Sequence, residues 1–239
     1  MTEEVCLHLI NTKIHAFLDG LDDYQKSIYR DYSVVFRYDK YSLGILKILP
    51  KIHKIKGEID KETWRLLSSR PIRGAECDPI NIPSKALYKM LQEMLQGFGA
   101  LFPKMSKYPN ISSFTVLKGC DEYINKISTI ELEVDSFNST YLISADFGDA
   151  YTETQIHRLE ESITIIGALL NYNKARVDLV VSLMKLVYTN CYFKTPFGIF
   201  RQTKGMPMGD VNCQNGKCTT WTIQEWKMHD LKNDKKCTP

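Results

Sequence analysis

The chain has 239 residues, of which 44% are hydrophobic and 25% charged, a composition typical of folded globular proteins and not of disordered ones. No apolar run approaches the ~20 residues that a membrane span needs, and the acidic opening MTEEVC lacks the basic start of a signal peptide. We therefore expect an intracellular protein, nuclear or cytoplasmic, with no membrane partner. Its seven scattered cysteines, odd in number, favour reduced thiols.

Charge is unevenly distributed along the chain, although the net charge is only +3. Residues 40–73 carry nine cations against three acids, a net of +6, whereas residues 120–165 carry ten acids against two cations, a net of −8. This contrast suits a protein in which phosphates meet metal-binding carboxylates. Two solvated surfaces of unlike sign explain the same charges, and on charge alone that interpretation is preferred.

The first half of the chain predicts two helices and a pair of strands. Apolar residues at helical spacing predict one helix over residues 3–30, with Thr2 as its N-cap. The β-branched segment 45–54 predicts a strand that runs into a basic loop, and residues 64–72 predict a returning strand. A second apolar face predicts a helix over residues 83–101.

The second half predicts a short apolar strand over residues 140–145, which ends directly at Asp146. Helices are expected over residues 154–170 and 175–189. A hairpin follows, with arms at residues 191–193 and 198–201 around Pro-Phe-Gly. Beyond Asp210 the sequence is polar and without a clear apolar period, so we expect a weakly structured tail.

Three sequence motifs contain residues suited to metal or phosphate binding. SADFGDAYT (144–152) places two aspartates directly after an apolar strand, where carboxylates suit Mg²⁺. FGIFRQTKGMPMG (197–209) combines glycines with amide and amine donors. LPKIHK (49–54) and SRPIRG (69–74) put cations on two neighbouring strands, where they could grip a triphosphate. In isolation each has an ordinary explanation: an acidic turn, a surface loop and a solvated basic hairpin.

Together and in this order, the motifs resemble those of reverse transcriptases, most closely the Penelope-like branch, which is related to telomerase. The resemblance implies an α+β fold, with the fingers and part of the palm of a right-hand polymerase over residues 41–210. An amino-terminal helical region would precede it over residues 1–40, and a divergent tail would follow over residues 211–239. LPKIHK and SRPIRG would lie on strands of the fingers.

The resemblance also implies a catalytic metal site. Asp146 matches the first catalytic aspartate, which binds Mg²⁺, and Phe147 matches the neighbour whose main-chain carbonyl faces a metal ion. Nucleotidyl transfer uses two metal ions, one that activates the primer 3′-hydroxyl and one that stabilises the leaving pyrophosphate. The expected cofactor is therefore Mg²⁺, and the expected partners are an RNA template, a DNA primer and deoxynucleoside triphosphates.

A nucleotide site is implied in the same way. Lys51 and Arg70 resemble the fingers cations that hold the triphosphate. Tyr151 falls at the steric-gate position, where a bulky ring excludes a ribose 2′-hydroxyl. Gln202 and Gly205 match the loop that lies against the incoming nucleotide and the template strand.

The sequence departs from the family at the second catalytic hairpin of the palm. A working polymerase needs a paired Asp-Asp there, and no Asp-Asp follows Asp146; the pair Asp22-Asp23 lies far upstream. We therefore expect a domain truncated before that hairpin, whose ancestral activity is RNA-directed DNA synthesis and which does not retain it. Two alternatives stay open: a non-catalytic RNA- or DNA-binding module that uses the basic fingers, and a gene fragment without a selected role.

Overall fold

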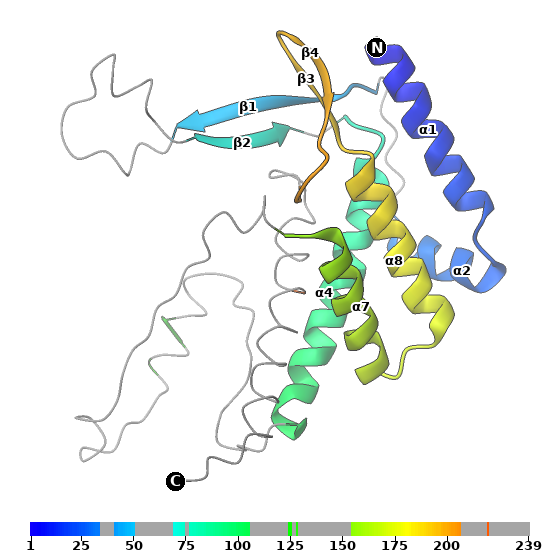
Figure 1. The fold of residues 1–239 in the computed structure, drawn as a ribbon. Coiled ribbons are helices and arrows are strands. Elements are labelled where there is room, and N and C mark those ends of the chain that lie inside the picture. The colour runs from blue at the N-terminus through cyan, green and yellow to red at the C-terminus, as the bar shows by residue number, and fades with distance from the viewer. Residues whose placement is uncertain are drawn as a thin grey trace.

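The computed structural model describes residues 1–33, 41–50, 69–74, 77–105, 124–125, 128, 154–206 and 219. Within these ranges the protein has five helices and a mixed four-stranded sheet, so its class is α+β, as expected. The helices pack side by side, and the strands lie at one end of them (Figure 1). The strand expected over residues 140–145 lies outside the described residues.

The amino-terminal region forms two helices, α1 (Glu3–Asp19) and α2 (Asp23–Tyr32), so the prediction of one helix over residues 3–30 is wrong. Thr2 caps α1 as predicted, since its side chain accepts a hydrogen bond from the Val5 amide. The chain breaks at Gly20, a poor helix former. Asp22 then starts α2 through a capping box in which the Gln25 amide donates to Asp22 Oδ1 at 2.7 Å.

Three further helices form the centre of the core: α4 (Asn81–Met105), α7 (Ile156–Leu169) and α8 (Lys174–Thr189). Their bounds match the predicted helices to within four residues at each end. Met90 and Met94 of α4 are buried, as the apolar face predicted. The buried cluster also includes side chains from α1 and α2, so all five helices share one hydrophobic core.

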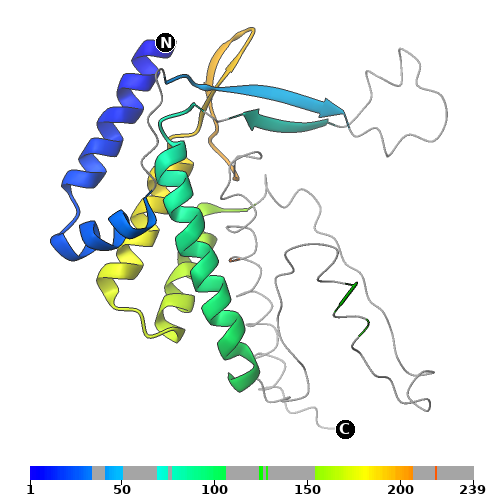
Figure 2. The ribbon, with the colours of Figure 1, turned by 180° about the vertical axis from the view of Figure 1, so that it is seen from behind.

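The sheet has the order β2-β1-β3-β4. β1 (Gly44–Pro50) pairs antiparallel with β2 (Ser69–Gly74) over six residue pairs, from Ile45 with Gly74 to Pro50 with Ser69. β3 (Tyr192–Thr195) and β4 (Gly198–Arg201) form the predicted hairpin. β1 and β3 run parallel and pair only at Gly44 with Phe193 and at Ile45 with Lys194. From both sides of the molecule, β1 and β2 extend away from the helices (Figures 1 and 2).

A polar cluster around Glu93 joins three of the helices. Glu93 of α4 accepts hydrogen bonds from the hydroxyls of Tyr32 and Tyr172 and from Arg176 NH2, the last at 2.7 Å. The Arg176 guanidinium also lies 4.1 Å from the centre of the Tyr172 ring. This cluster ties the end of α2 to α4 and to the start of α8.

Within the described residues, none of the helices combines the length and the apolar character that crossing a bilayer requires.

Candidate nucleic-acid interface

The strands and their immediate flanks form a region without acidic residues. We call residues 41–50, 69–74 and 191–206 the basic sheet region. It contains six cations and no aspartate or glutamate: Lys47, Arg70, Arg73, Lys194, Arg201 and Lys204. The side chains of Lys47, Arg201 and Lys204 are exposed to solvent. A surface of this sign attracts anionic ligands such as phosphates.

Large apolar side chains are exposed between these cations. Phe197, at the tip of the β3–β4 hairpin, is 92% exposed, and Phe200 is 48% exposed. Phe200 stacks on Phe193 across the hairpin, with ring centroids 6.2 Å apart and an interplanar angle of 22°. On β1, Ile45 and Ile48 are also exposed. Exposed aromatic rings among cations are the groups on which nucleic-acid bases stack.

Two of the six cations are neutralised by acids that lie outside the strands. Lys194 forms an ion pair with Glu3 of α1, at 2.8 Å, and both side chains are half-buried. The same Glu3 carboxylate accepts the Leu43 amide at 2.9 Å. The first turn of α1 therefore holds the start of β1 and the middle of β3 together.

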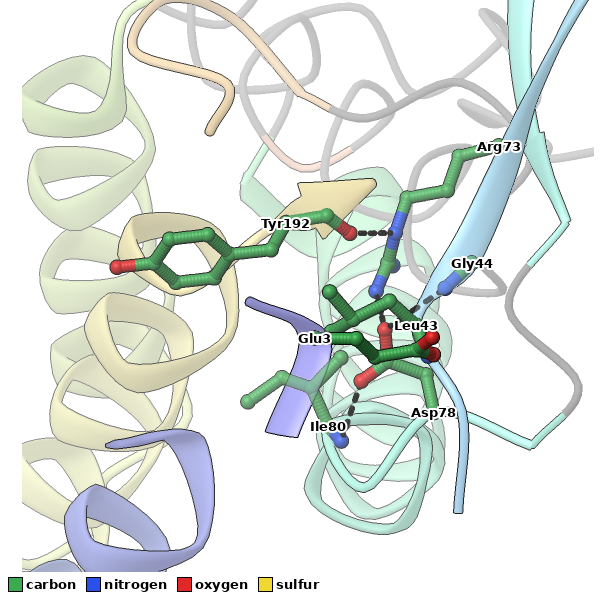
Figure 3. A network of polar contacts seen from close by, with 7 residues as sticks. All are labelled: Glu3, Leu43, Gly44, Arg73, Asp78, Ile80 and Tyr192. Carbon is green, nitrogen blue, oxygen red and sulfur yellow. Dashed lines mark hydrogen bonds and ion pairs between the residues drawn. The ribbon is translucent and has the colours of Figure 1, made fainter. Parts of the chain in front are cut away.

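Arg73 makes the other ion pair, and this one is buried. Arg73 is 3% exposed and its partner Asp78 is fully buried. Arg73 NH2 donates to Asp78 Oδ2, and Arg73 Nε donates to the Tyr192 carbonyl at 2.9 Å (Figure 3). The other Asp78 oxygen accepts the Ile80 amide at 3.0 Å, just before α4. This network joins β2 and β3 to the amino-terminal end of α4.

Burial raises the pKa of Asp78, because the charged form loses its contact with water. The positive charge of Arg73 opposes this rise, as do the hydrogen bonds from the Ile80 and Gly44 amides and from Arg73. Such an ion pair needs these additional hydrogen bonds, because the attraction of the two charges alone only offsets the cost of their desolvation.

Arg73 therefore corrects part of the sequence interpretation. Its position in SRPIRG placed it among the cations that could grip a triphosphate, but the structure buries its guanidinium against Asp78 and Tyr192. Sequence reasoning also missed Asp78. Its signal was the Asp78-Pro79 step a few residues before the helix predicted over residues 83–101, in a segment where an aspartate oxygen commonly accepts a backbone amide.

The loop after β4 contains the two predicted nucleotide-site residues that the structure describes in full. Gln202 is half-buried, and its Nε2 donates to the Lys204 carbonyl at 2.9 Å. Its backbone amide donates to the Cys191 carbonyl at 2.9 Å. Gly205 is buried and has a φ of 74°, a conformation that favours glycine. These bonds form a tight turn that presents Lys204 to solvent beside the hairpin.

Of the remaining predicted site residues, the structure describes only the backbone of Arg70. The backbone of Arg70 lies on β2, paired with Leu49. Lys51, Asp146, Phe147 and Tyr151 lie outside the described residues. Their predicted roles stay predictions.

The Mg²⁺ site expected from the resemblance depends on those residues. In the ranges that the structure describes, no group of three or more histidine, cysteine or acidic side chains could hold a metal ion. Cys6, Cys77 and Cys191 are free thiols.

Comparison with family models, with curated proteins and with solved structures found no match to this chain.

Proposed function

We propose that this chain is a reverse-transcriptase-derived domain that binds a single RNA strand on its basic sheet region and does not catalyse polymerisation. The observation that carries the proposal is the combination of three exposed cations, Lys47, Arg201 and Lys204, with exposed aromatic rings in the basic sheet region, which has no acids of its own. Phosphates recognise the cations, and unpaired bases stack on the rings.

The placement of the motifs supports the family assignment within this proposal. The resemblance implies that LPKIHK and SRPIRG lie on fingers strands. The first two residues of LPKIHK, Leu49 and Pro50, lie at the end of β1, and SRPIRG coincides with β2, its antiparallel partner. FGIFRQTKG begins in the tip of the β3–β4 hairpin of the same sheet. Motifs from both halves of the chain therefore meet in one sheet.

The ancestral reaction belongs to the same proposal. It would be RNA-directed DNA synthesis from deoxynucleoside triphosphates, with Mg²⁺ held by Asp146 and the Phe147 carbonyl, and with Lys51, Arg70 and Tyr151 at the nucleotide. A right-hand arrangement of fingers and partial palm would position these groups.

Fluorescence anisotropy with a labelled oligouridylate of about 12 nucleotides tests the binding. We expect affinity to fall steeply as salt rises from about 50 to about 200 mM, because bound cations release counterions. Arg201→Gln should reduce the slope of log affinity against log salt by about 0.7, the loss of one phosphate contact on a single strand. Lys89→Gln, which removes an exposed cation from helix α4, is the matched control.

Phe197→Ala tests the aromatic part of the interface. Its ring is 92% exposed, so the substitution leaves the fold intact. It should weaken binding by about 1–3 kcal/mol, the contribution of one stacked base, without changing the salt slope. Tyr24→Ala, which removes an exposed ring from α2, should not weaken binding. Salt-independent binding, or equal effects of Arg201→Gln and Lys89→Gln, would refute the proposal.

A further inference from the structure

The sheet consists of two antiparallel strand pairs that are joined by a short contact. The strand pair β1–β2 has six residue pairs and the hairpin β3–β4 has four, but β1 and β3 share only two. A junction of two residue pairs leaves few ladder hydrogen bonds to fix the angle between the two strand pairs. Their relative orientation must depend on other contacts.

The Arg73 side chain makes such a contact. β2 and β3 are not neighbours in the sheet, because β1 lies between them. Arg73 nevertheless starts on β2 and donates from Nε to the Tyr192 carbonyl on β3 (Figure 3). Asp78 holds the far end of the guanidinium. The planar guanidinium suits this task because its donors are fixed relative to one another.

Gly44 allows Arg73 to cross β1. A Cβ at Gly44 would lie 2.9 Å from Arg73 Cγ and 3.0 Å from Arg73 Nε, and only 2.4 Å from the Gly74 carbonyl oxygen. Any larger residue at Gly44 would therefore displace the arginine or the strand. Gly74, its neighbour on β2, has room: the nearest atom to a Cβ there is the Ile45 carbonyl oxygen at 3.9 Å.

We propose that Arg73 is a positioning residue, which fixes the strand pair β1–β2 relative to the hairpin β3–β4 so that one RNA strand contacts the cations of both. Lys47 on β1 and Arg201 on β4 supply exposed cations on the two sides of the junction. This inference rests on the proposed RNA binding. It assigns Arg73 no contact with RNA, in contrast to the exposed cations.

Gly44→Ala tests the inference without a change of charge. If the two strand pairs lose their fixed orientation, the RNA contacts one of them at a time. We expect a loss of affinity of about tenfold or more at low salt, since linked contacts reinforce one another. The salt slope should also fall by about 0.7 or more, because at least one phosphate contact is lost. Gly74→Ala, the matched control, should retain the affinity and the slope of the unchanged chain.

Arg73→Lys provides a second variant in case Gly44→Ala does not fold. Lysine keeps the charge opposite Asp78 but lacks the fork that reaches Tyr192 at the same time. It should reproduce both losses, and hydrogen exchange should be faster in β1 and β3 while α4 and α8 are unchanged. A stability role alone would leave the affinity and salt slope of the folded protein as they are, and that result would overturn the inference.

The outcomes separate this inference from the proposed function. If the unchanged chain shows no salt-dependent RNA binding, the proposed function fails. Hydrogen exchange then still decides whether Arg73 fixes the junction: faster exchange in β1 and β3 supports it, and unchanged exchange refutes it. If the chain binds RNA and Gly44→Ala folds with unchanged affinity and slope, the inference fails and the function stands.

Discussion

Arg73 and Asp78 lose nearly all contact with water in the folded protein. Removal of one partner leaves the other as an uncompensated buried charge, which typically costs about 3–5 kcal/mol. We expect Arg73→Met or Asp78→Asn to lower the free energy of unfolding by an amount in that range, measured by urea unfolding. The double variant Arg73→Met/Asp78→Asn should lose less than the two single losses added together, because it leaves no charge unpaired.

Lys194→Met is the matched control on the same sheet. Its ion pair with Glu3 is half-exposed, so water solvates either charge when the other is removed. Pairs of this kind typically contribute less than about 1 kcal/mol. Equal losses in Lys194→Met and Arg73→Met would contradict the role that burial plays in this argument.

At the residue scale, the sequence predicts which residues are basic but not which of them stay exposed. Arg73 and Arg201 look alike in the sequence, since each follows apolar residues of a strand. The difference comes from two partners of Arg73: Asp78, just beyond the end of β2, and the Tyr192 carbonyl on β3, more than a hundred residues later. A contact between residues so far apart in the chain cannot be predicted from the spacing of residues around Arg73.

At the scale of elements, the helix break at Gly20–Asp22 shows how a local signal is overlooked. The apolar spacing continues from α1 into α2, and that continuity favoured one helix. Asp22 with Gln25 three residues later is nevertheless a capping-box pattern, and Gly20 precedes it. Helices α4, α7 and α8 and the β3–β4 hairpin match their predicted ranges closely, because helical apolar spacing and a Pro-Phe-Gly turn mark them in the sequence. For the strands predicted over residues 45–54 and 64–72, the structure describes β1 and β2 at 44–50 and 69–74, and the rest of both ranges lies outside the described residues.

The cluster around Glu93 makes the packing of the helices dependent on pH. Burial, together with the hydrogen bond to Glu93, raises the pKa of Tyr32 from 10 to about 12. The folded state therefore favours the neutral phenol, and this contribution to stability is complete below pH 10 and is lost as the pH rises towards 12. Partial burial tends to raise the pKa of Glu93, but hydrogen bonds from Tyr32, Tyr172 and Arg176 and the Arg176 charge outweigh it and lower that pKa.

Tyr32→Phe removes the titrating group and should flatten the stability profile between pH 10 and about 12, as measured by thermal unfolding at each pH. Burial also raises the pKa of Tyr29 to about 12. Tyr29 is present in both proteins, so its contribution to the pH dependence cancels when the two profiles are compared. At the acid end, Glu93→Gln should be less stable than the unchanged chain above pH 4.5, where the lowered pKa of Glu93 stabilises the folded state. The difference should shrink as the pH falls below 4.5, because the unchanged chain then loses this contribution. Tyr24→Phe, on the exposed side of α2, is the control; a profile of Tyr32→Phe identical to that of the unchanged chain would contradict the assignment.

At the scale of the whole molecule, charge segregation in the sequence corresponds to a sheet without acids. The basic segment 40–73 predicts cations on two strands. β1 lies inside this segment, and β2 ends one residue beyond it. The sequence could not predict that β3 and β4, more than a hundred residues later, would extend the same sheet. β3 begins three residues after the end of α8, and α8 packs against α1 and α4. The position of α8 therefore places β3 beside β1.

Under the proposed function, the acids of the whole chain also bear on catalysis. Asp146 and Asp149 are the acids of the SADFGDAYT motif, and no Asp-Asp follows them in the 239 residues. Two-metal nucleotidyl transfer needs carboxylates that both ions share, so that the attacking hydroxyl and the leaving pyrophosphate are in line. Each ~1.4 kcal/mol of lost transition-state stabilisation lowers the rate tenfold, and the loss of a metal ligand commonly costs several times that amount.

We therefore expect no primer extension by this chain on a primed RNA template with Mg²⁺ or Mn²⁺, assayed by gel electrophoresis of a labelled primer. The control is a chimera in which the residues after Gly209 are replaced by the remaining palm and the thumb of an active reverse transcriptase. The chimera should extend the primer, and Asp146→Ala should abolish that extension, because under the proposed function Asp146 is the first of the carboxylates that hold the metal ions. Extension by the unmodified chain that disappears in Asp146→Ala would show that this protein assembles a catalytic site from other carboxylates.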